Sequence, residues 1–310
     1  MNNQNNQQAV TGYSNPEYAA SLSQFGTPSY LAECGGSLLI RAIPDCSEQD
    51  AMGCYPLFTC QDWTKLHYNL QNLSDDLVSI ALVADPFGAY DEEYLHNCFP
   101  NIMVPFKEHF VIDMRCSPEK VLSKHHRYYV RKALKEVAVD ICEEPITMIY
   151  EWYQLYQNLI QRHHLTGIKA FSFEAFATQL NIPGIVAIRA SARGELIGAH
   201  LWYMQGDVAY SHLAASSPLG YELMSAYAIY WKAIEYFAEK VRWINIGAGA
   251  GIADKEDSGL TRFKRGWATG TRSVYFCGRI LNHKKYEILV KSRNITPSAY
   301  FPLYRKGELA

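Results

Sequence analysis

Short runs of apolar and β-branched residues alternate with longer segments that carry apolar residues every three or four positions. The short runs predict strands and the longer segments predict helices, because side chains repeat every two residues in a strand and about every 3.6 in a helix. We expect strands at 37–43, 78–84, 109–114, 137–142, 184–190, 195–204, 207–214, 243–247 and 272–278. We expect helices at 62–70, 119–136, 147–164, 172–180, 221–240, 258–266 and 283–293.

Turn residues in the second half indicate how its strands pair. Arg193-Gly194 and Gln205-Gly206-Asp207 join neighbouring strands as hairpins, which predicts a mixed sheet. Strands and helices occur in both halves, and 310 residues suit roughly two domains. We therefore expect an α/β protein, of α+β type with mixed sheets, built from two loosely similar halves, 29–143 and 144–310. Residues 1–28, which contain no Lys or Arg, are expected to form a mobile tail.

Composition narrows the class of protein. Hydrophobic residues make up 48% and charged residues 19%, which supports a large core and excludes wholesale disorder. The formal net charge of −2 argues against a protein that coats polyanions, but not against one local basic site. The eight cysteines form no C-x-x-C pair, so we expect reduced thiols and no metal.

The ends and apolar runs of the sequence bear on its location. The first ten residues lack the basic start and apolar stretch of a signal peptide. Apolar runs elsewhere are shorter than the ~18 residues that indicate a membrane span. We therefore expect a soluble, cytoplasmic protein with no membrane span.

Several stretches of the second half form a recognisable series. They are 195–203, 208–212, the helix after Gly220-Tyr221, Ile246-Gly-Ala-Gly249 and, above all, Gly259-Leu-Thr-Arg-Phe-Lys-Arg-Gly-Trp267. In their order and spacing they resemble the FemAB-like branch of the GNAT superfamily of N-acetyltransferases. The basic segment 124–133 and the tail 300–305 extend the likeness to about 106–305. The resemblance implies two GNAT-like halves in tandem and the transfer of an acyl or aminoacyl group to an amine, in cell-envelope or exopolysaccharide metabolism. The carriers that it implies are acyl-CoA, acyl carrier protein or aminoacyl-tRNA.

One stretch departs from the pattern of the relatives that use acetyl-CoA. Those proteins hold the pyrophosphate with Arg/Gln-x-x-Gly-x-Gly/Ala at a helix start, where backbone N–H groups meet phosphate. Here the stretch is Ser217-Pro-Leu-Gly-Tyr-Glu222, in which the basic residue and the last small residue are missing and Glu222 would repel phosphate. This disfavours acetyl-CoA. The chain also has no sustained heptad pattern like the coiled-coil arm of relatives that use aminoacyl-tRNA, which weakens that donor without excluding it.

A row of cations marks the helix expected at 119–136. Lys120, Lys124, Arg127, Arg131 and Lys135 are spaced three or four apart and therefore fall on one stripe. One interpretation is a solvated helix face. The other is a phosphate site, for which we select Lys124, Arg127 and Arg131, because carrier nucleotides, phosphopantetheine and tRNA all present phosphate. A weaker hypothesis is that this helix binds nucleic acid. We expect no nucleic-acid partner except a tRNA that acts as the acyl donor.

Lys264 is the first candidate for catalysis. Leu260, Phe263 and Trp267 form a one-sided apolar face, and Lys264 lies at its edge. A lysine there either snorkels to solvent or points into a cleft. In the resembled family the Phe-Lys pair borders the active site, which implies that Lys264 stabilises an oxyanion or substrate charge and that Phe263 holds its stem or contacts substrate.

The paired strands supply candidates for proton transfer. His200 and Trp202 share one face of their strand, and Tyr210 and His212 share one face of the next. If the hairpin brings these faces together, His212 is a candidate base, Tyr210 a candidate proton donor, and His200 and Trp202 candidate substrate contacts. The alternative for each is a packed, hydrogen-bonded core residue.

Gly247 and Gly249 follow a predicted strand. Their spacing is G-x-G-x-G rather than the G-x-G-x-x-G of a dinucleotide fold. We interpret them as glycines that let the backbone approach a ligand or a neighbouring strand, and take both as candidate substrate contacts. The first hypothesis is a cytoplasmic N-acyltransferase or aminoacyltransferase that moves an acyl group from acyl-CoA, acyl carrier protein or aminoacyl-tRNA to an amine of a small molecule, glycan or peptide. It needs no tightly bound cofactor. The alternative is a non-catalytic GNAT-like module that binds a phosphorylated glycan precursor or a partner protein.

Overall fold

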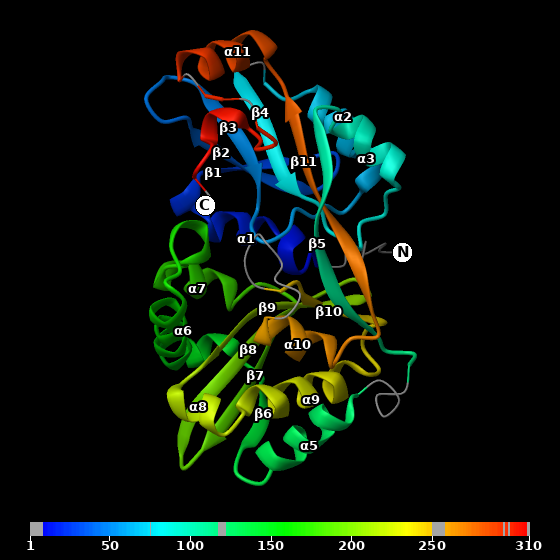
Figure 1. The fold of residues 1–310 in the computed structure, drawn as a ribbon, viewed down its shortest axis with the longest axis vertical. Coiled ribbons are helices and arrows are strands. Elements are labelled where there is room, and N and C mark those ends of the chain that lie inside the picture. Colours follow the sequence, from blue (N-terminus) through cyan, green and yellow to red (C-terminus); the bar gives the residue numbers. More distant parts are fainter. Residues whose placement is uncertain are drawn as a thin grey trace, which may run out of the picture. The chain divides into compact units, whose positions relative to one another are not determined.

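The computed structural model describes residues 9–74, 76–116, 122–249, 258–293, 295–296 and 298–308. The chain forms two compact units that interleave along the sequence (Figure 1). Unit 1 comprises Met1–Tyr18, Val111–Ile246 and Arg265–Thr269, and unit 2 comprises Ala19–Phe110, Gly247–Lys264 and Gly270–Ala310. The expected division between residues 143 and 144 therefore falls inside unit 1, because the end of the chain returns to the sheet that the beginning builds.

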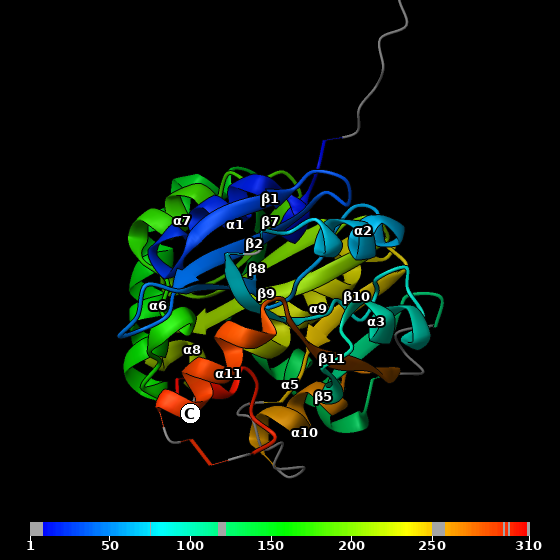
Figure 2. The ribbon, with the colours of Figure 1, turned by 90° about the horizontal axis from the view of Figure 1, so that it is seen from above.

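Unit 2 is a mixed sheet with helices. Its strands are β1 (Thr27–Leu31), β2 (Gly36–Ala42), β3 (Gln49–Gly53), β4 (Leu77–Val83) and β11 (Gly270–Ile280), in that order, followed by β5 (Ile102–Asp113). The first three pair antiparallel, β4 runs parallel to β3, and β11 runs antiparallel to β4. The helices of this unit are η2 (Ser23–Phe25), η3 (Trp63–Lys65), α2 (Leu66–Gln71), α3 (Glu92–Cys98), α11 (His283–Ser292) and η6 (Leu303–Arg305). Helices α2 and α3 lie side by side (Figure 2).

Unit 1 repeats this plan. Its strands are β6 (Ala138–Cys142), β7 (Ile185–Ala192), β8 (Glu195–Gln205), β9 (Val208–Ser216) and β10 (Trp243–Gly247). The strands β6 to β9 pair antiparallel in sequence order, and β10 runs parallel to β9. Both Arg193 and Gly194 have positive φ in the β7–β8 turn, as a tight hairpin requires. The predicted hairpins and mixed sheet are confirmed.

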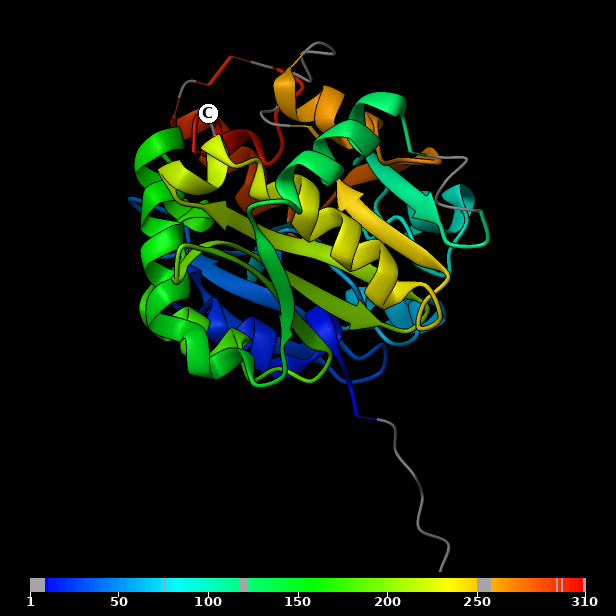
Figure 3. The same ribbon diagram turned by 90° about the horizontal axis from the view of Figure 1, so that it is seen from below.

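Helices cover both faces of the sheet in unit 1 (Figure 3). On one face Tyr203 of β8 donates a hydrogen bond to the carbonyl of Gln179, the last residue of α7. On the other face Trp202 packs against Phe237 of α9. The helices of this unit are η1 (Gly12–Ser14), α5 (Lys124–Ala133), η4 (Pro145–Met148), α6 (Ile149–His163), η5 (Gly167–Lys169), α7 (Phe173–Gln179), α8 (Pro218–Glu222) and α9 (Ser225–Phe237). Two further helices, α1 (Pro16–Ser21) and α10 (Gly259–Arg265), run across the unit boundaries.

The two units share one order of elements. Each has three consecutive antiparallel strands, then a helix, then a strand parallel to the third: β1-β2-β3-α2-β4 in unit 2 and β7-β8-β9-α9-β10 in unit 1. This repeated order confirms the prediction of two similar α/β halves with mixed sheets.

The segment expected to be a mobile tail is structured from Thr11 onward. Tyr13 and Tyr18 are buried in unit 1, and Leu22 is buried in unit 2. Burial of these side chains offsets the entropy of ordering the segment, so the prediction of a mobile tail is wrong for residues 11–28. Residues 1–8 of that prediction lie outside the described residues.

Two predicted helices have different bounds. The helix expected at 119–136 is α5, which begins at Lys124 because the Ser123 side chain accepts the hydrogen bond of the His126 amide at 3.1 Å. The expected start at 117–119 lies outside the described residues. The helix expected at 221–240 is broken at Met224, whose φ of 57° is left-handed and separates α8 from α9.

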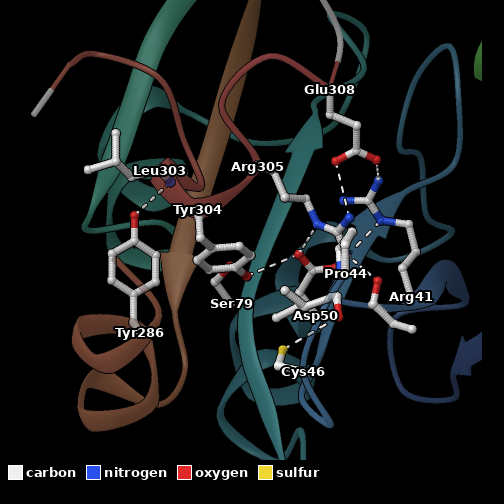
Figure 4. Close-up of polar contacts among 12 residues, drawn as sticks. Arg41, Pro44, Cys46, Asp50, Ser79, Tyr286, Leu303, Tyr304, Arg305 and Glu308 are labelled. Carbon is white, nitrogen blue, oxygen red and sulfur yellow. Dashed lines mark hydrogen bonds and ion pairs between the residues drawn. The ribbon is translucent and has the colours of Figure 1, made fainter. Parts of the chain in front are cut away.

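The C-terminal segment is tied to the sheet of unit 2 by a buried ion pair (Figure 4). Arg305 of η6 meets both carboxylate oxygens of Asp50 on β3, at 2.5 and 2.8 Å. Tyr304 donates to the same carboxylate at 3.0 Å and lies 2.8 Å from the Ser79 hydroxyl on β4. Glu308 contacts the outer edge of the Arg305 guanidinium at 3.1 Å. We call these residues the C-terminal clasp.

Candidate functional site

Lys264 lies on α10, after the turn that follows β10. Its half-buried side chain donates a hydrogen bond from Nζ to the Ala248 carbonyl at 2.6 Å. Gly247 has φ of 71°, in the region that favours glycine, and a Cβ atom there would lie 3.3 Å from the same Nζ. The ammonium group is therefore held against the backbone of the turn.

A second lysine reaches the same turn. Lys107 of β5 donates to the Gly249 carbonyl at 3.5 Å, and its Nζ lies 5.8 Å from the centre of the Phe106 ring. Two ammonium groups thus contact consecutive carbonyls, those of Ala248 and Gly249. We call residues 247–249 together with Lys107 and Lys264 the lysine turn. Two cations at one turn favour an anion or a developing negative charge.

The remaining residues predicted around this turn are placed only in part. Phe263 is half-buried on α10, next to Lys264 in sequence. Gly247 and Gly249 both belong to the lysine turn, and their contact with substrate stays a prediction. Residues 250–257, which complete the glycine-rich segment and its polar continuation, lie outside the described residues.

The faces that carry the candidate histidines do not meet, which corrects the prediction. The tight turn pairs Gln205 with Val208 and so places Trp202 opposite Ser211, and a bulge between Leu201 and Trp202 shifts the pairing beyond that point. His200 Nε2 lies 2.8 Å from the Ser211 hydroxyl. His200 and Trp202 are buried against each other, with ring centres 4.1 Å apart, on the face that α9 covers.

His212 lies on the opposite face in a hydrogen-bonded core. Its Nδ1 is 3.1 Å from the Tyr13 hydroxyl, and its Nε2 is 3.2 Å from Gln179 Oε1. The Gln179 oxygen can only accept, so Nε2 carries the proton and Nδ1 accepts from Tyr13. Burial lowers the pKa of His212 to about 3, which leaves a weak base at neutral pH. Tyr210 is also buried, with its ring 5.7 Å from that of Tyr13.

All four candidates on the hairpin, His200, Trp202, Tyr210 and His212, are buried among other side chains, as in the alternative of packed core residues. A proton-transfer role for His212 and Tyr210 does not fit a neutral histidine enclosed by Tyr13 and Gln179, because a general base must reach the substrate proton. Likewise, His200 and Trp202 lie in the layer between sheet and α9, where they contribute packing.

The departure from the acetyl-CoA pattern has a structural counterpart. Helix α8 is only five residues long, and the Ser217 side chain accepts the Gly220 amide at 3.1 Å. A Cβ at Gly220 would lie 2.1 Å from the Ile197 carbonyl, so this turn is pressed against β8. One amide at the helix start is thus already bound by the protein. The parallel pairing of β10 with β9 ends at Asn245 and Tyr210, so the two strands separate beyond that point.

The predicted basic stripe lies on α5. Lys124 and Arg131 are exposed and Arg127 is half-buried, while His126, Val130 and Ala133 form the buried face toward α9. The structure therefore places the three cations on the outer side of the helix, as the helical spacing predicted. Lys120 lies outside the described residues.

Two kinds of site find no support in the part of the chain that the structure describes. No group of three or more His, Cys, Asp or Glu side chains there could hold a metal ion. None of the helices in these ranges has the length and apolar character needed to cross a bilayer.

Sequence reasoning missed Lys107 and the Tyr13–Gln179 pair. Lys107 stands in a short polar run of β5, Lys107-Glu108-His109, and this run alone does not single it out as a site residue. Tyr13 belongs to a segment of polar composition, and its contact with His212 spans 199 residues. The local signals that led to the lysine turn were the position of Lys264 at an apolar margin and the glycines Gly247 and Gly249 after a predicted strand.

Comparisons with known proteins find relatives by structure alone. No protein-family model matches this sequence, and no curated protein matches it. The structure resembles that of FemX, with a TM-score of 0.66 and 13% identity over 88% of this chain and 93% of FemX. It also resembles L-PGS from Bacillus licheniformis, with a TM-score of 0.56 and 12% identity over 93% of this chain and 98% of that one.

A third similar structure is described as the C-terminal domain (DUF2156) of a lysylphosphatidylglycerol synthetase from Agrobacterium fabrum. Its TM-score is 0.59 at 12% identity, over 91% of this chain and 93% of that chain. Likenesses at these identities establish the fold. The chain shares the fold of these three structures, FemX among them, which agrees with the fold that the resemblance in its second half implied.

Proposed function

We propose that this protein is an N-acyltransferase or aminoacyltransferase that moves an acyl group from an activated carrier to an amine. The observation that carries the proposal is the lysine turn, where Lys264 is fixed at 2.6 Å from the Ala248 carbonyl and Lys107 reaches the next carbonyl. The fold shared with FemX and with a lysylphosphatidylglycerol synthetase domain supports the same class of reaction.

The chemistry assigns Lys264 a definite task. The acceptor nitrogen attacks the carbonyl carbon of the carrier thioester or ester and forms a C–N bond, and negative charge develops on the carbonyl oxygen. The C–S or C–O bond then breaks, and the carrier leaves with a proton that the amine supplies. A cation already held in place stabilises the oxyanion without reorganising, and loss of one such donor costs ~3–4 kcal/mol.

The geometry of α8 favours a donor other than acetyl-CoA. The Gly220 amide donates to the Ser217 side chain, and Glu222 is the last residue of the same short helix. Compared with the acetyl-CoA pattern, a pyrophosphate here would find one backbone N–H donor fewer and would face an additional negative charge. We therefore propose acyl carrier protein or aminoacyl-tRNA as the carrier. The acceptor is an amine of a small molecule, glycan or peptide, and the resemblance to FemAB-like proteins supports a place in cell-envelope or polysaccharide metabolism.

The test is donor consumption by the purified chain with and without Lys264. Acyl-CoAs, acyl carrier proteins and charged tRNAs are each offered with a mixed pool of amines. We expect turnover of one donor class, reduced roughly 100- to 1,000-fold in Lys264→Met. Lys107→Met should give a smaller reduction, since its contact with the turn is longer.

The matched control is Lys291→Met, which removes an exposed lysine of α11 whose partner Glu287 is 3.5 Å away. Its turnover should equal that of the unchanged chain. Equal turnover in Lys264→Met would refute the assignment of Lys264. Consumption of no donor by folded protein would instead favour the non-catalytic binding module.

A further inference from the structure

The outer surface of α5 concentrates positive charge to a degree found on no other helix in the described part of the chain. Residues 122–135 contain no Asp or Glu. At 100° per residue, the five cations of this segment fall within roughly 140° of the helix circumference. They are Lys124, Arg127, Arg131, Lys132 and, in the turn after the helix, Lys135. We call this set, with Tyr128 and Leu134, the α5 surface.

These cations differ from most lysines of the other long helices. Lys232 of α9 pairs with Glu235 at 3.7 Å, and two of the three α11 lysines, Lys285 and Lys291, pair with Glu48 and Glu287 at 2.8 and 3.5 Å. Among the residues that the structure describes, no carboxylate lies within 4.0 Å of a cation of the α5 surface.

Like charges three and four residues apart destabilise a helix by ~0.2–0.5 kcal/mol per pair. The repulsion among these cations therefore destabilises α5, although the chain as a whole has a net charge of −2. A bound anionic partner would relieve this repulsion.

Two large apolar side chains lie among these charges. Tyr128 is 61% exposed and lies near the middle of the charged arc, and Leu134 is 46% exposed at one end of it. An exposed tyrosine surrounded by cations is the composition of a protein-binding surface with an anchor and a charged rim. Nucleic acids are bound by cations at the phosphates and by aromatic side chains that stack on the bases, so the aliphatic Leu134 would contribute little to such binding.

The opposite face of α5 holds the helix rigidly. His126 is buried with its ring 5.1 Å from Trp267 and 5.2 Å from Tyr227 of α9. A Cβ at Gly266 would lie 1.9 Å from the His126 ring, so that glycine permits the contact. Tyr129 stacks on Tyr227 at 5.1 Å. The α5 surface is thus presented by a helix that cannot rotate without breaking this aromatic cluster.

From the row of cations and from the exposed Tyr128 and Leu134 on one helix, we infer that the α5 surface docks an acidic helix of the carrier protein that brings the acyl group. This inference rests on the proposed transferase function. The row from Lys124 to Lys135 is roughly 16 Å long at 1.5 Å per residue. A partner helix that presents an acid on each turn would meet it along its length, with Tyr128 and Leu134 against the partner's apolar positions. Charge complementarity of this kind raises association rates and selects the partner.

The experiment measures equilibrium binding of purified holo-acyl carrier protein to the full chain, at low and physiological salt. We expect binding that weakens as salt rises. Lys124→Glu with Arg131→Glu should weaken it at least roughly tenfold, and Tyr128→Ala should weaken it several-fold with little change in its salt dependence. The control with the same change in net charge is Lys284→Glu with Lys291→Glu on α11, which should bind as the unchanged chain does.

A second probe is transfer RNA, tested on the same variants. If RNA binds and requires Lys124 and Arg131 while acyl carrier protein does not bind, the inference is overturned in favour of a nucleic-acid surface. If neither binds, or if the α11 control loses as much affinity as the α5 variant, it is overturned in favour of a solvated face. Lys264→Met should keep full affinity for the carrier protein, so a failure of transfer and a failure of docking are told apart.

Discussion

The C-terminal clasp permits a prediction whose magnitude follows from the structure. Asp50 and Arg305 have side chains that are 1% and 6% exposed, and they meet through two hydrogen bonds in addition to their opposite charges (Figure 4). Asp50→Asn keeps the shape of the side chain and removes its charge. Arg305 is then left buried without a full counter-charge, while Tyr304 keeps its contact with Ser79.

Breaking a buried ion pair by removing one partner costs about 3–5 kcal/mol, because the remaining charge stays out of water without compensation. We expect a loss of this size for Asp50→Asn and for Arg305→Met. The double variant removes both charges, so its loss should be smaller than the sum of the two by about 2–3 kcal/mol. The exposed pair Lys291–Glu287 offers the matched comparison, and Lys291→Met should change stability by less than about 0.5 kcal/mol.

The assay is urea unfolding followed by the fluorescence of Trp63. Of the six tryptophans, Trp63 alone belongs to unit 2, where it is buried against Tyr90 with ring centres 4.6 Å apart. Subtracting the signal of a Trp63→Phe chain isolates unit 2. The free energy of unfolding is extrapolated linearly to water, and an unchanged slope shows that the variants alter stability and not compactness.

A loss below about 1 kcal/mol for Asp50→Asn, at unchanged slope, would contradict the reasoning, because solvent would then be screening the Arg305 charge. Strict additivity of the two single variants would contradict it too, since residues in direct contact should couple.

Two predictions concern unit 1. Because burial lowers the pKa of His212 from 6.5 to about 3, the unfolded chain binds a proton below pH 6.5 that the folded chain does not, so stability falls as pH decreases. Between pH 6.5 and 5 the loss should be about 2 kcal/mol, and His212→Gln should remove this part of the pH dependence; equal slopes for both chains would exclude it. Gly266→Ala should destabilise unit 1 by more than about 2 kcal/mol, since the new methyl group meets the His126 ring at 1.9 Å, whereas Gly270→Ala, which meets nothing within 4 Å, should change stability little. Comparable unfolding midpoints for the two glycine variants would show that His126 can move aside.

Local sequence was sufficient for most of the regular elements of both units. Strands β2, β4 and β7 to β10 follow runs of apolar and β-branched residues, and the hairpin turns are marked by Arg193-Gly194 and Gly206-Asp207. These elements form from side-chain periodicity and turn chemistry, which act over a few residues. The same local patterns carried the resemblance to the FemAB-like fold.

Strand β3 shows where local pattern fails. Its sequence, Gln-Asp-Ala-Met-Gly, contains a buried aspartate, which reads as a polar position that should face solvent. Asp50 can be buried because Arg305 neutralises it from 255 residues further along the chain. When the partner of a buried polar group lies far away in sequence, the residues next to that group do not indicate that it is buried.

The candidate site residues also fall into two groups, those that local spacing placed correctly and those that depend on contacts between segments. The amphipathic spacing around Phe263 and Trp267 placed Lys264 at the margin of an apolar face, and the spacing on α5 placed its cations on one side. Neither required knowledge of distant residues. Whether the histidine faces meet depends on the register across the hairpin. The turn places Trp202 opposite Ser211, a bulge follows between Leu201 and Trp202, and His200 and His212 lie on opposite faces.

The sequence by itself therefore determined most strands, most helices and the candidate lysine, because each depends on periodicity within one element, and the order of these elements indicated two similar halves. Only the tertiary structure decided that Lys107 joins Lys264 at one turn, that Tyr13 encloses His212, and that the C-terminal segment closes on Asp50. These contacts join residues far apart in the chain, and their free energy comes from burial and charge that no single segment possesses.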